Sequence, residues 1–419
     1  MRLLDVALKA SRGRQTLHHL RSTYSVGVSS ATVSAIEHAL ACGPDGGPGD
    51  AFVDRLRRRG LVADEPFRAI PRRSSSELVS IELEPFGSCN LRCRHCFVDF
   101  SGAVMTQQTF ERVLEGALDA DAVELTFNGG EPLLHVRCLD WIERARASGL
   151  RTLLFTNATC VGPDVADRLA KAGVARVTVS LDGFQPEHDA VRGHGSFDRA
   201  VRGIRELTQR GVCVFTTTLV HPANEARVKE LQTFCREVLG VAGCRTSTVA
   251  PMGRARQAPD LLLSTRALMA VYSDESAGES ESNAPGVSST SEQLLACGAG
   301  VDKLYVSASG RVFGCHLFEL SGGTLGHLAE SSLSEILARA RMSTLLRISK
   351  DDLPVCAACP AFSSCAGGCR ARARAMTGSQ HGPDPVACAK RGLGEIATFS
   401  RAKTNGPPQK LAERARSDP

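Results

Sequence analysis

A regular alternation of strand-like and helix-like segments between residues 78 and 251 most constrains what this chain can fold into. Runs rich in valine, leucine, isoleucine and threonine predict strands, and apolar residues at three- and four-residue spacing predict the helices that follow them. The predicted strands are 78–85, 122–130, 151–159, 175–183, 212–220 and 244–251, and the predicted helices are 106–120, 141–147, 163–173, 196–211 and 224–240. Such alternation indicates an α/β fold whose parallel sheet is open or curled into a partial barrel.

Unusual motifs follow four of these strands. Three cysteines come directly after the first strand, and an Asn-Gly-Gly-Glu-Pro segment, 128–132, follows the second. The third strand ends in Thr-Asn-Ala-Thr and the fourth in Ser-Leu-Asp-Gly. Because chemistry in such folds gathers at the carboxyl ends of the strands, we expect one site at this rim of the sheet.

The cysteine content bears on the kind of site. The chain has 16 cysteines, and ten of them fall in two groups, 89–96 and 297–388. No apolar run approaches the ~18 residues of a membrane helix, and the start lacks the apolar core of a signal peptide. We therefore expect a cytoplasmic protein without a membrane partner, in which clustered cysteines indicate metal or catalysis rather than disulfides. The net charge of +5 does not indicate a nucleic-acid partner.

The first group has the spacing C-x3-C-x2-C, formed by Cys89, Cys93 and Cys96. A structural zinc site needs four ligands, and His95 is a poor fourth because it is adjacent to Cys96. A 4Fe–4S cluster is held by thiolates and can accept three protein ligands, which leaves one iron free for a substrate or cofactor. The spacing therefore favours an iron–sulfur cluster.

With these motifs, residues 78–255 resemble the radical S-adenosylmethionine (SAM) enzymes. The resemblance implies that the three cysteines hold a 4Fe–4S cluster whose fourth iron binds the amino and carboxylate groups of SAM. Cleavage of SAM then gives a 5′-deoxyadenosyl radical, which abstracts hydrogen from an unreactive carbon. The SAM contacts that it implies are Gly129, Gly130, Glu131 and Pro132 for the methionine amino group, Ser180 and Asp182 near the ribose, Arg192 for the methionine carboxylate, and His95 against the adenine.

The second group contains Cys297, Cys315, Cys356, Cys359, Cys365, Cys369 and Cys388. Seven cysteines do not divide into two closed four-ligand zinc sites, although a zinc ribbon is the alternative. The pattern resembles the SPASM extension of radical SAM enzymes, which implies two auxiliary 4Fe–4S clusters and three clusters in all. By that resemblance the outer cluster is held by Cys356, Cys359, Cys365 and Cys388, and the inner one by Cys297, Cys315 and Cys369. We hypothesise that the inner cluster has an open site.

His316 follows Cys315 directly. The sulfatase-maturing relatives carry an aspartate there that acts as a base. A histidine can also act as a base at neutral pH, so His316 is a candidate catalytic residue, and a plain polar residue beside a cluster is the alternative. The replacement of aspartate disfavours sulfatase maturation.

Residues 1–75 differ in character from the rest, with helices predicted at 28–42 and 50–62. This region resembles the small, winged-helix-like α+β peptide-recognition domain of ribosomal-peptide pathways, which binds a leader peptide as an added strand. A helical cap and an unrelated winged helix are the alternatives. The predicted division is a peptide-recognition-like domain at 1–75, a partial (β/α)6 radical SAM barrel at 78–260, a flexible linker at 261–295, a cysteine-rich SPASM domain at 296–390, and a C-terminal helix or tail at 391–419.

These features together predict an oxidative maturase. Its substrate would be a ribosomally synthesised precursor peptide with a leader, its cofactors SAM and three 4Fe–4S clusters, and its reductant a flavodoxin or ferredoxin. One alternative is a radical SAM dehydrogenase that acts on a small molecule or matures a sulfatase-like protein. Another is an iron–sulfur electron carrier or peptide adaptor, but the intact cysteine and Gly-Gly-Glu-Pro motifs count against it.

Overall fold

The computed structural model describes residues 2–3, 6–11, 14–19, 25–28, 62–63, 78–98, 100–275, 298–320, 323–343, 346 and 348–393. In these ranges, no helix is long and apolar enough to span a membrane.

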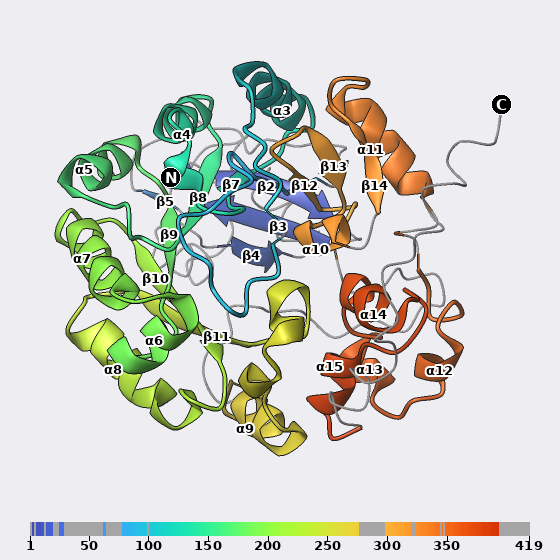
Figure 1. Cartoon of the computed structure of the whole chain (residues 1–419). Coiled ribbons are helices and arrows are strands. Elements are labelled where there is room, and N and C mark those ends of the chain that lie inside the picture. Colours follow the sequence, from blue (N-terminus) through green and yellow to red (C-terminus); the bar gives the residue numbers. More distant parts are fainter. Residues whose placement is uncertain are drawn as a thin grey trace.

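Six parallel strands form the barrel wall, and Figure 1 shows them ringed by helices. They are β6 (Ser80–Leu83), β7 (Glu124–Phe127), β8 (Arg151–Thr156), β9 (Arg176–Ser180), β10 (Val214–Val220) and β11 (Gly243–Thr248), and each pairs with the next. The helices between them are α3 (Gln107–Asp119), α4 (Cys138–Ala147), α5 (Pro163–Ala172), α6 (Gln185–Arg192), α7 (Ser196–Gln209) and α8 (Val228–Glu237). The predicted α/β fold with its six parallel strands is confirmed.

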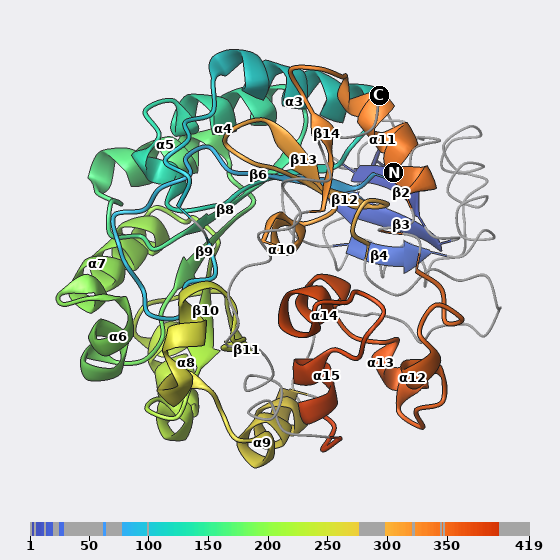
Figure 2. The same ribbon diagram turned by 45° about the vertical axis from the view of Figure 1, so that its right-hand side comes forward.

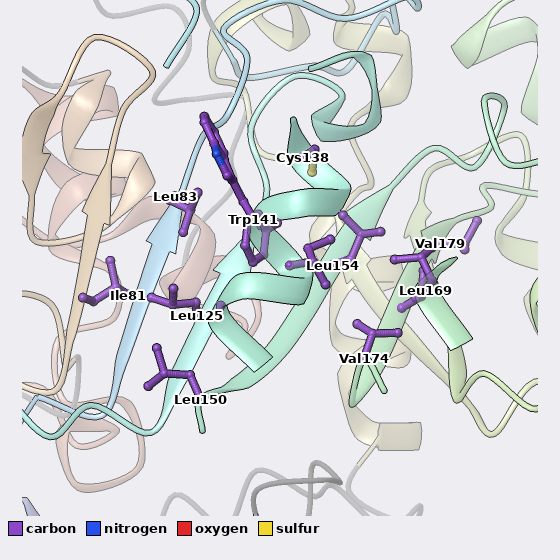
Figure 3. Close-up of a cluster of buried hydrophobic side chains, with 14 of the residues drawn as sticks. Ile81, Leu83, Leu125, Cys138, Trp141, Leu150, Leu154, Leu169, Val174 and Val179 are labelled. Atoms are coloured by element: carbon purple, nitrogen blue, oxygen red, sulfur yellow. The ribbon is translucent and has the colours of Figure 1, made fainter. Parts of the chain in front are cut away.

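The main core lies between the strands and this layer of helices. Trp141 of α4 is 1% exposed and stacks on Phe110 of α3 with ring centroids 4.7 Å apart. Figure 3 shows Trp141 and Leu154 among the buried side chains of this cluster. Because outward-facing strand residues such as Leu125 are also fully buried, the strands are covered by helices along this face.

Helix ends follow the signals in the sequence. Thr106 caps α3, and its hydroxyl accepts a hydrogen bond from the Thr109 amide at 3.1 Å. Pro163 begins α5, and Gly173 ends it in the left-handed conformation with φ of 67°. These caps fix where the helices that connect the barrel strands begin and end.

The sheet continues beyond the barrel into the cysteine-rich region (Figure 2). Strand β12 (Lys303–Val306) pairs in parallel with β6, and β13 (Arg311–Phe313) and β14 (Thr324–His327) follow in antiparallel pairs, to give a nine-stranded sheet. The helices of this region are α10 (His316–Glu319), α11 (Leu333–Met342), α12 (Pro354–Ala357), α13 (Phe362–Cys365), α14 (Arg370–Thr377) and α15 (Pro385–Ala389). Because β12 lies beside β6, this region is attached next to the strand that precedes the first cysteines.

Two helices correct the sequence analysis. Helix α6 was not predicted, and α9 (Thr265–Glu275) lies in the segment 261–295 that was predicted as a flexible linker. Leu268 of α9 is 1% exposed and packs with Val386 and Ala389 of α15. The linker prediction is therefore wrong for 265–275, because these residues are held by apolar contacts to a distant part of the chain; 276–295 lie outside the described residues.

At the N-terminus, β2 (Val6–Ser11), β3 (Arg14–His19) and β4 (Ser25–Val28) form a three-stranded antiparallel sheet, and β1 (Arg2–Leu3) pairs with β5 (Val62–Ala63). The predicted helices 28–42 and 50–62 fall outside the described residues except at Val28 and Val62, which are in strands. The tail predicted from 391 is described only to 393.

The three-stranded sheet lies at the amino end of the barrel strands. It lies behind the ring of strands in Figure 1 and to one side of it in Figure 2. Arg151, the first residue of β8, donates to the Ser25 hydroxyl of β4 at 3.4 Å. This sheet is therefore at the end of the barrel opposite the motif-bearing loops.

Candidate active site

The loop after β6 carries the first three cysteines and is held by the motif after β7. The Glu131 amide donates to the Ser88 carbonyl at 2.9 Å. A Cβ atom at Gly130 would lie 2.0 Å from that same carbonyl oxygen, and one at Gly129, whose φ is 119°, would lie 2.5 Å from the Glu84 side chain. The two glycines are needed because the two loops approach so closely. Pro132 begins the short 3₁₀ helix η2 (Pro132–Leu134) beyond them.

The thiols of Cys89, Cys93 and Cys96 lie close enough to influence one another electrostatically. Burial raises the pKa of Cys89 to about 11, and the neighbouring sulfurs of Cys93 and Cys96 add to the rise. Burial also raises the pKa of Cys93. A metal or cluster that binds here must displace the thiol protons, because thiolates are the ligands. The donor set and the glycine-lined approach therefore fit a cluster held by Cys89, Cys93 and Cys96, as the sequence predicts.

The Glu131 carboxylate is satisfied by the protein itself. It is 0% exposed and accepts hydrogen bonds from the Thr156 hydroxyl, the Asn157 amide and the Leu133 amide at 2.8, 2.8 and 3.2 Å. These donors tie the loop after β7 to the end of β8. The geometry thus gives Glu131 a role in fixing the loop, whereas the predicted contact with the amino group of SAM stays a prediction.

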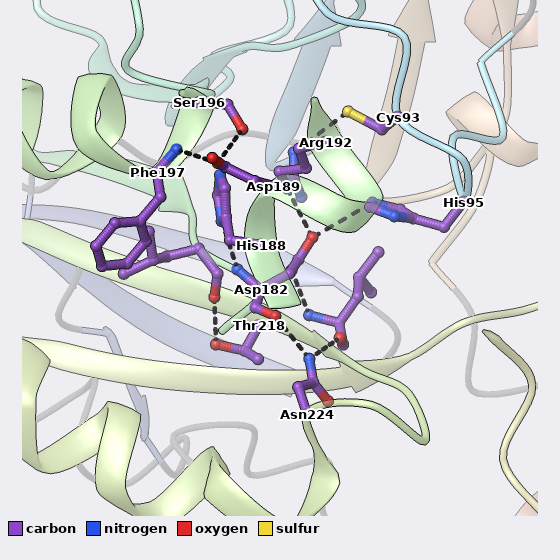
Figure 4. A network of polar contacts seen from close by, with 12 residues as sticks. Cys93, His95, Asp182, His188, Asp189, Arg192, Ser196, Phe197, Thr218 and Asn224 are labelled. Atoms are coloured by element: carbon purple, nitrogen blue, oxygen red, sulfur yellow. Dashed lines mark hydrogen bonds and ion pairs between the residues drawn. The ribbon is translucent and has the colours of Figure 1, made fainter. Parts of the chain in front are cut away.

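A buried ion pair lies beside the cysteine loop (Figure 4). Arg192 at the end of α6 donates from Nε to Asp182 at 2.6 Å, and its Nη1 lies 3.8 Å from the Cys93 sulfur. Although burial alone would raise it, the Arg192 charge holds the pKa of Asp182 well below its usual range. Asp182 also accepts from the Leu219 amide at 2.8 Å. Asp182 therefore fixes the guanidinium next to the cysteine loop.

His95 points into the same network (Figure 4). It is 7% exposed, and its Nε2 lies 3.5 Å from Asp182. Burial lowers the pKa of His95 to about 4, so the ring is neutral near pH 7. Its Nδ1 is buried and has no hydrogen-bond partner among the described residues. Ser180 is half-buried at the end of β9. The predicted SAM contacts of Ser180, Asp182, Arg192 and His95 remain predictions, but the last three form one connected group.

The second cysteine group is brought together in two parts. Burial raises the pKa of Cys388 to about 11, and the sulfurs of Cys365, Cys356 and Cys359 contribute, so these four thiols are neighbours. Cys315 and Cys369 pack against one apolar cluster that contains Tyr305 and Phe313. Cys297 lies outside the described residues. The described cysteines thus fall into two groups, and their assignment to an outer and an inner cluster stays a prediction.

No three metal-binding side chains in the described part of the chain converge tightly enough to hold a single ion. A cubane of four irons and four sulfides spans more space than one ion and is bound at its corners by thiolates.

His316 pairs with a residue that the sequence analysis missed. Its Nδ1 lies 3.1 Å from the Glu82 carboxylate of β6. Although burial lowers it, this carboxylate raises the pKa of His316 above the ordinary value. A signal for Glu82 was present in the sequence: in β6, Ile81 and Leu83 are buried in the main core, so the alternate residues face the barrel interior.

The segment after β11 also contacts the cysteine loop. The segment after β11 contains the 3₁₀ helices η4 (Gly253–Gln257) and η5 (Pro259–Leu261). The Arg254 amide donates to the Cys96 carbonyl at 2.9 Å, and its guanidinium lies 4.8 Å from the centre of the Phe100 ring. In addition, Arg94 of the loop donates to Asp260 at 2.8 Å. We call the segment 253–260 the clasp, because it contacts the cysteine loop at Cys96 and Arg94.

The comparisons with known proteins agree with this geometry. The Radical SAM superfamily model matches residues 83–235, and the SPASM model, an iron–sulfur cluster-binding domain, matches residues 297–360. The chain has a radical SAM domain followed by a SPASM domain. The predicted resemblance to radical SAM enzymes with a SPASM extension is confirmed.

Similar proteins carry several activities. An AdoMet-dependent heme synthase of Oleidesulfovibrio alaskensis is 26% identical and aligns over 78% of this chain and 92% of its own length. The mycofactocin maturase MftC of Mycobacterium tuberculosis is 28% identical, over 71% and 80%. Among solved structures, Streptococcus suis SuiB bound to precursor peptide SuiA has a TM-score of 0.67 at 15% identity, over 92% of this chain and 98% of that one. The chain is thus similar both to enzymes named as heme synthases and to one named as a maturase.

Proposed function

We propose that this radical SAM/SPASM enzyme is an oxidative maturase of a ribosomally synthesised precursor peptide. Cys89, Cys93 and Cys96 would hold the SAM-binding cluster, and the second cysteine group would hold two auxiliary clusters. When bound, the cluster and SAM supply a radical that can take hydrogen from an unactivated carbon. Electrons would come from a flavodoxin or ferredoxin.

The residues of the chain do the positioning. The Arg192 guanidinium keeps Nη groups beside Cys93 that suit a carboxylate, and Asp182 holds it in place. The clasp at Gly253 and Arg254 covers the loop. A reactive carbon held near this loop and shielded from water would react without competing quenching.

The observation that carries the peptide proposal is the small antiparallel sheet at the amino end of the barrel. In the described residues, β4 pairs with β3 on one side alone, so its other edge has the pattern that an extended peptide can join. The solved SuiB structure with its precursor peptide aligns over 92% of this chain. MftC, a maturase by name, supports the same substrate class.

A small-molecule substrate is the second candidate. The heme synthases align over most of the chain at an identity close to that of MftC. Such an enzyme would have no use for a leader-binding sheet. Loss of residues 1–77 without loss of turnover would therefore favour it.

The test is anaerobic co-expression with a short peptide encoded beside the gene, followed by mass spectrometry. We expect the peptide to lose pairs of hydrogens with the intact enzyme and to stay unchanged with Cys89→Ala. An unchanged peptide, from enzyme that holds about twelve irons and still cleaves SAM, would reject this peptide as the substrate.

Leader recognition has a separate test. The full-length enzyme should bind a synthetic leader peptide, measured by fluorescence polarisation, and binding should survive Cys89→Ala because the sheet lies at the other end of the barrel. Turnover of the core peptide without its leader at the full rate would argue against the recognition role.

A further inference from the structure

Three polar side chains, those of Glu82, Asn128 and His316, meet through hydrogen bonds. Asn128, just after β7, donates from Nδ2 to Glu82 Oε1 at 2.6 Å. His316, at the start of α10, lies with Nδ1 3.1 Å from Glu82 Oε2. Both oxygens of one carboxylate are therefore occupied by different segments of the chain, and Glu82 has little freedom to rotate.

Ring contacts fix the imidazole as well. His316 stacks on Phe97 with centroids 5.2 Å apart and an angle of 29° between the planes. Tyr305 meets it edge-on at 6.2 Å. One nitrogen and the plane of the ring are thus both determined by the protein.

The place of this ring in the chain is as informative as its contacts. Phe97 follows Cys96 of the first cysteine group, and His316 follows Cys315 of the second. The stacked pair therefore bridges the segments that would carry the SAM-binding cluster and the inner auxiliary cluster. A substrate bound between these two sites would lie near this ring.

The other nitrogen of His316 is available. Nε2 makes no hydrogen bond with the described residues, and it is not one of their buried atoms that lack a partner. The His316 side chain is 33% exposed. A carboxylate that binds one nitrogen of a histidine sets the orientation of the ring and the direction of the second nitrogen. The arrangement leaves a single fixed polar atom that a ligand can reach.

We propose that Glu82, braced by Asn128, is a positioning residue that holds His316 so that Nε2 hydrogen-bonds a polar group of the bound substrate between the two cysteine groups. The class of that group, an amide or hydroxyl of a peptide, rests on the proposed function; the positioning by Glu82 does not. Glu82 acts through His316 and need not touch the substrate itself.

The first experiment tests the contact by thermal unfolding of the cluster-loaded enzyme. Glu82→Gln, His316→Gln and the double variant form a cycle, and we expect the double variant to lower Tm by less than the sum of the two single shifts. Additive shifts would overturn the positioning. This readout needs no substrate, so it stands even if the wild-type enzyme modifies no peptide and the proposed function fails.

The second experiment separates the two nitrogens. Asn in place of His316 can still donate toward Glu82 but has no atom equivalent to Nε2. We expect His316→Asn and Glu82→Gln to lower kcat for the peptide ~10- to 100-fold, and by clearly more than they lower the rate of SAM cleavage without peptide. Peptide turnover at the wild-type rate in either variant would overturn the proposal, as would an equal loss of SAM cleavage without peptide.

Glu335→Gln is the matched control. Its carboxylate also accepts two hydrogen bonds, from the amide and hydroxyl of Ser332, but it caps α11 on the outside of the molecule. It should lower Tm and leave peptide turnover unchanged. A loss of turnover equal to that of Glu82→Gln would show that destabilisation alone explains the effect, and would overturn the proposal.

Discussion

Glu84 is a buried carboxyl beside Gly129 of the site. It is 3% exposed and accepts a hydrogen bond from the Ala308 amide at 3.0 Å. Burial raises its pKa to about 7. The native state therefore keeps a proton that the unfolded chain loses near its ordinary pKa of 4.5, so stability falls as pH rises from about 4.5 to 7.

Glu84→Gln removes this titration. We expect the variant to gain ~2–3 kcal/mol relative to wild type at pH 8 and to differ little at pH 4.5, because a glutamine oxygen can still accept from Ala308. Denaturant unfolding at the two pH values measures the difference. An equal pH dependence in both proteins would contradict the assignment of a near-neutral pKa.

Two Asp–Arg pairs, one buried and one exposed, show how burial changes the contribution of the same ion pair to stability. Asp182→Asn leaves the buried Arg192 without its counter-charge, and we expect a loss of about 3–5 kcal/mol together with weaker SAM binding. Asp260→Asn breaks the pair with Arg94 and should lower the free energy of unfolding by ~1 kcal/mol or less, because the Asp260 and Arg94 side chains are 58% and 45% exposed. Chemical denaturation measures both, and equal losses would be inconsistent with a buried charge at Arg192.

At the scale of single residues, local motifs could be predicted from the sequence and distant pairings could not. The cysteines and the Gly-Gly-Glu-Pro turn have fixed spacing along the chain, so they were found directly. The partner of His316 is 234 residues away. The alternation in β6 predicts which face of the strand Glu82 is on. It does not predict that His316 lies next to that face, because this depends on the fold of the whole chain.

At the scale of elements, the clasp after β11 determines how firmly the cysteine loop is held. Gly253 has φ of 53°, and a Cβ there would lie 2.6 Å from the Phe97 Cα. Gly102, in the same loop region, has φ of 70° and nothing within 4 Å of its Cβ position. An alanine at either position would suffer backbone strain, because both glycines have a positive φ. Only at Gly253 would the added Cβ also collide with the cysteine loop.

We therefore expect Gly253→Ala to lose about four of some twelve irons after reconstitution, whereas Gly102→Ala keeps them. Iron and sulfide analysis of the purified variants gives the answer. Equal retention would mean that the clasp does not support the cluster loop.

Element prediction succeeded where local signals were complete. Helix α5 has a proline at its start and a glycine at its end, and its predicted limits match. Helix α6 has only 8 residues and no side-chain cap, so no periodic signal marked it. Helix α9 lies where composition changes, and its contacts with α15 cross more than a hundred residues, which no local pattern records.

At the scale of the whole molecule, the barrel and the cysteine-rich region share one sheet and one core. Strand β12 pairs with β6 over four residues, and Leu304, Val306 and Ile336 belong to the same apolar cluster as the barrel strands. The sequence predicted the two regions as separate domains. The continuous sheet could not be predicted, because the pairing of β6 with β12 depends on residues more than two hundred positions apart.

This continuity leads to a prediction about truncation. A chain that ends at Glu275 leaves the β6 edge unpaired and uncovers apolar side chains of the main core, so we expect it to aggregate. A chain that ends at residue 393 retains every described strand and should melt like the full-length protein in a single transition. Calorimetry and size-exclusion chromatography distinguish the outcomes. A soluble, monomeric 1–275 chain with its own cooperative transition would show that the barrel folds without β12, and that the shared sheet joins two independently stable units.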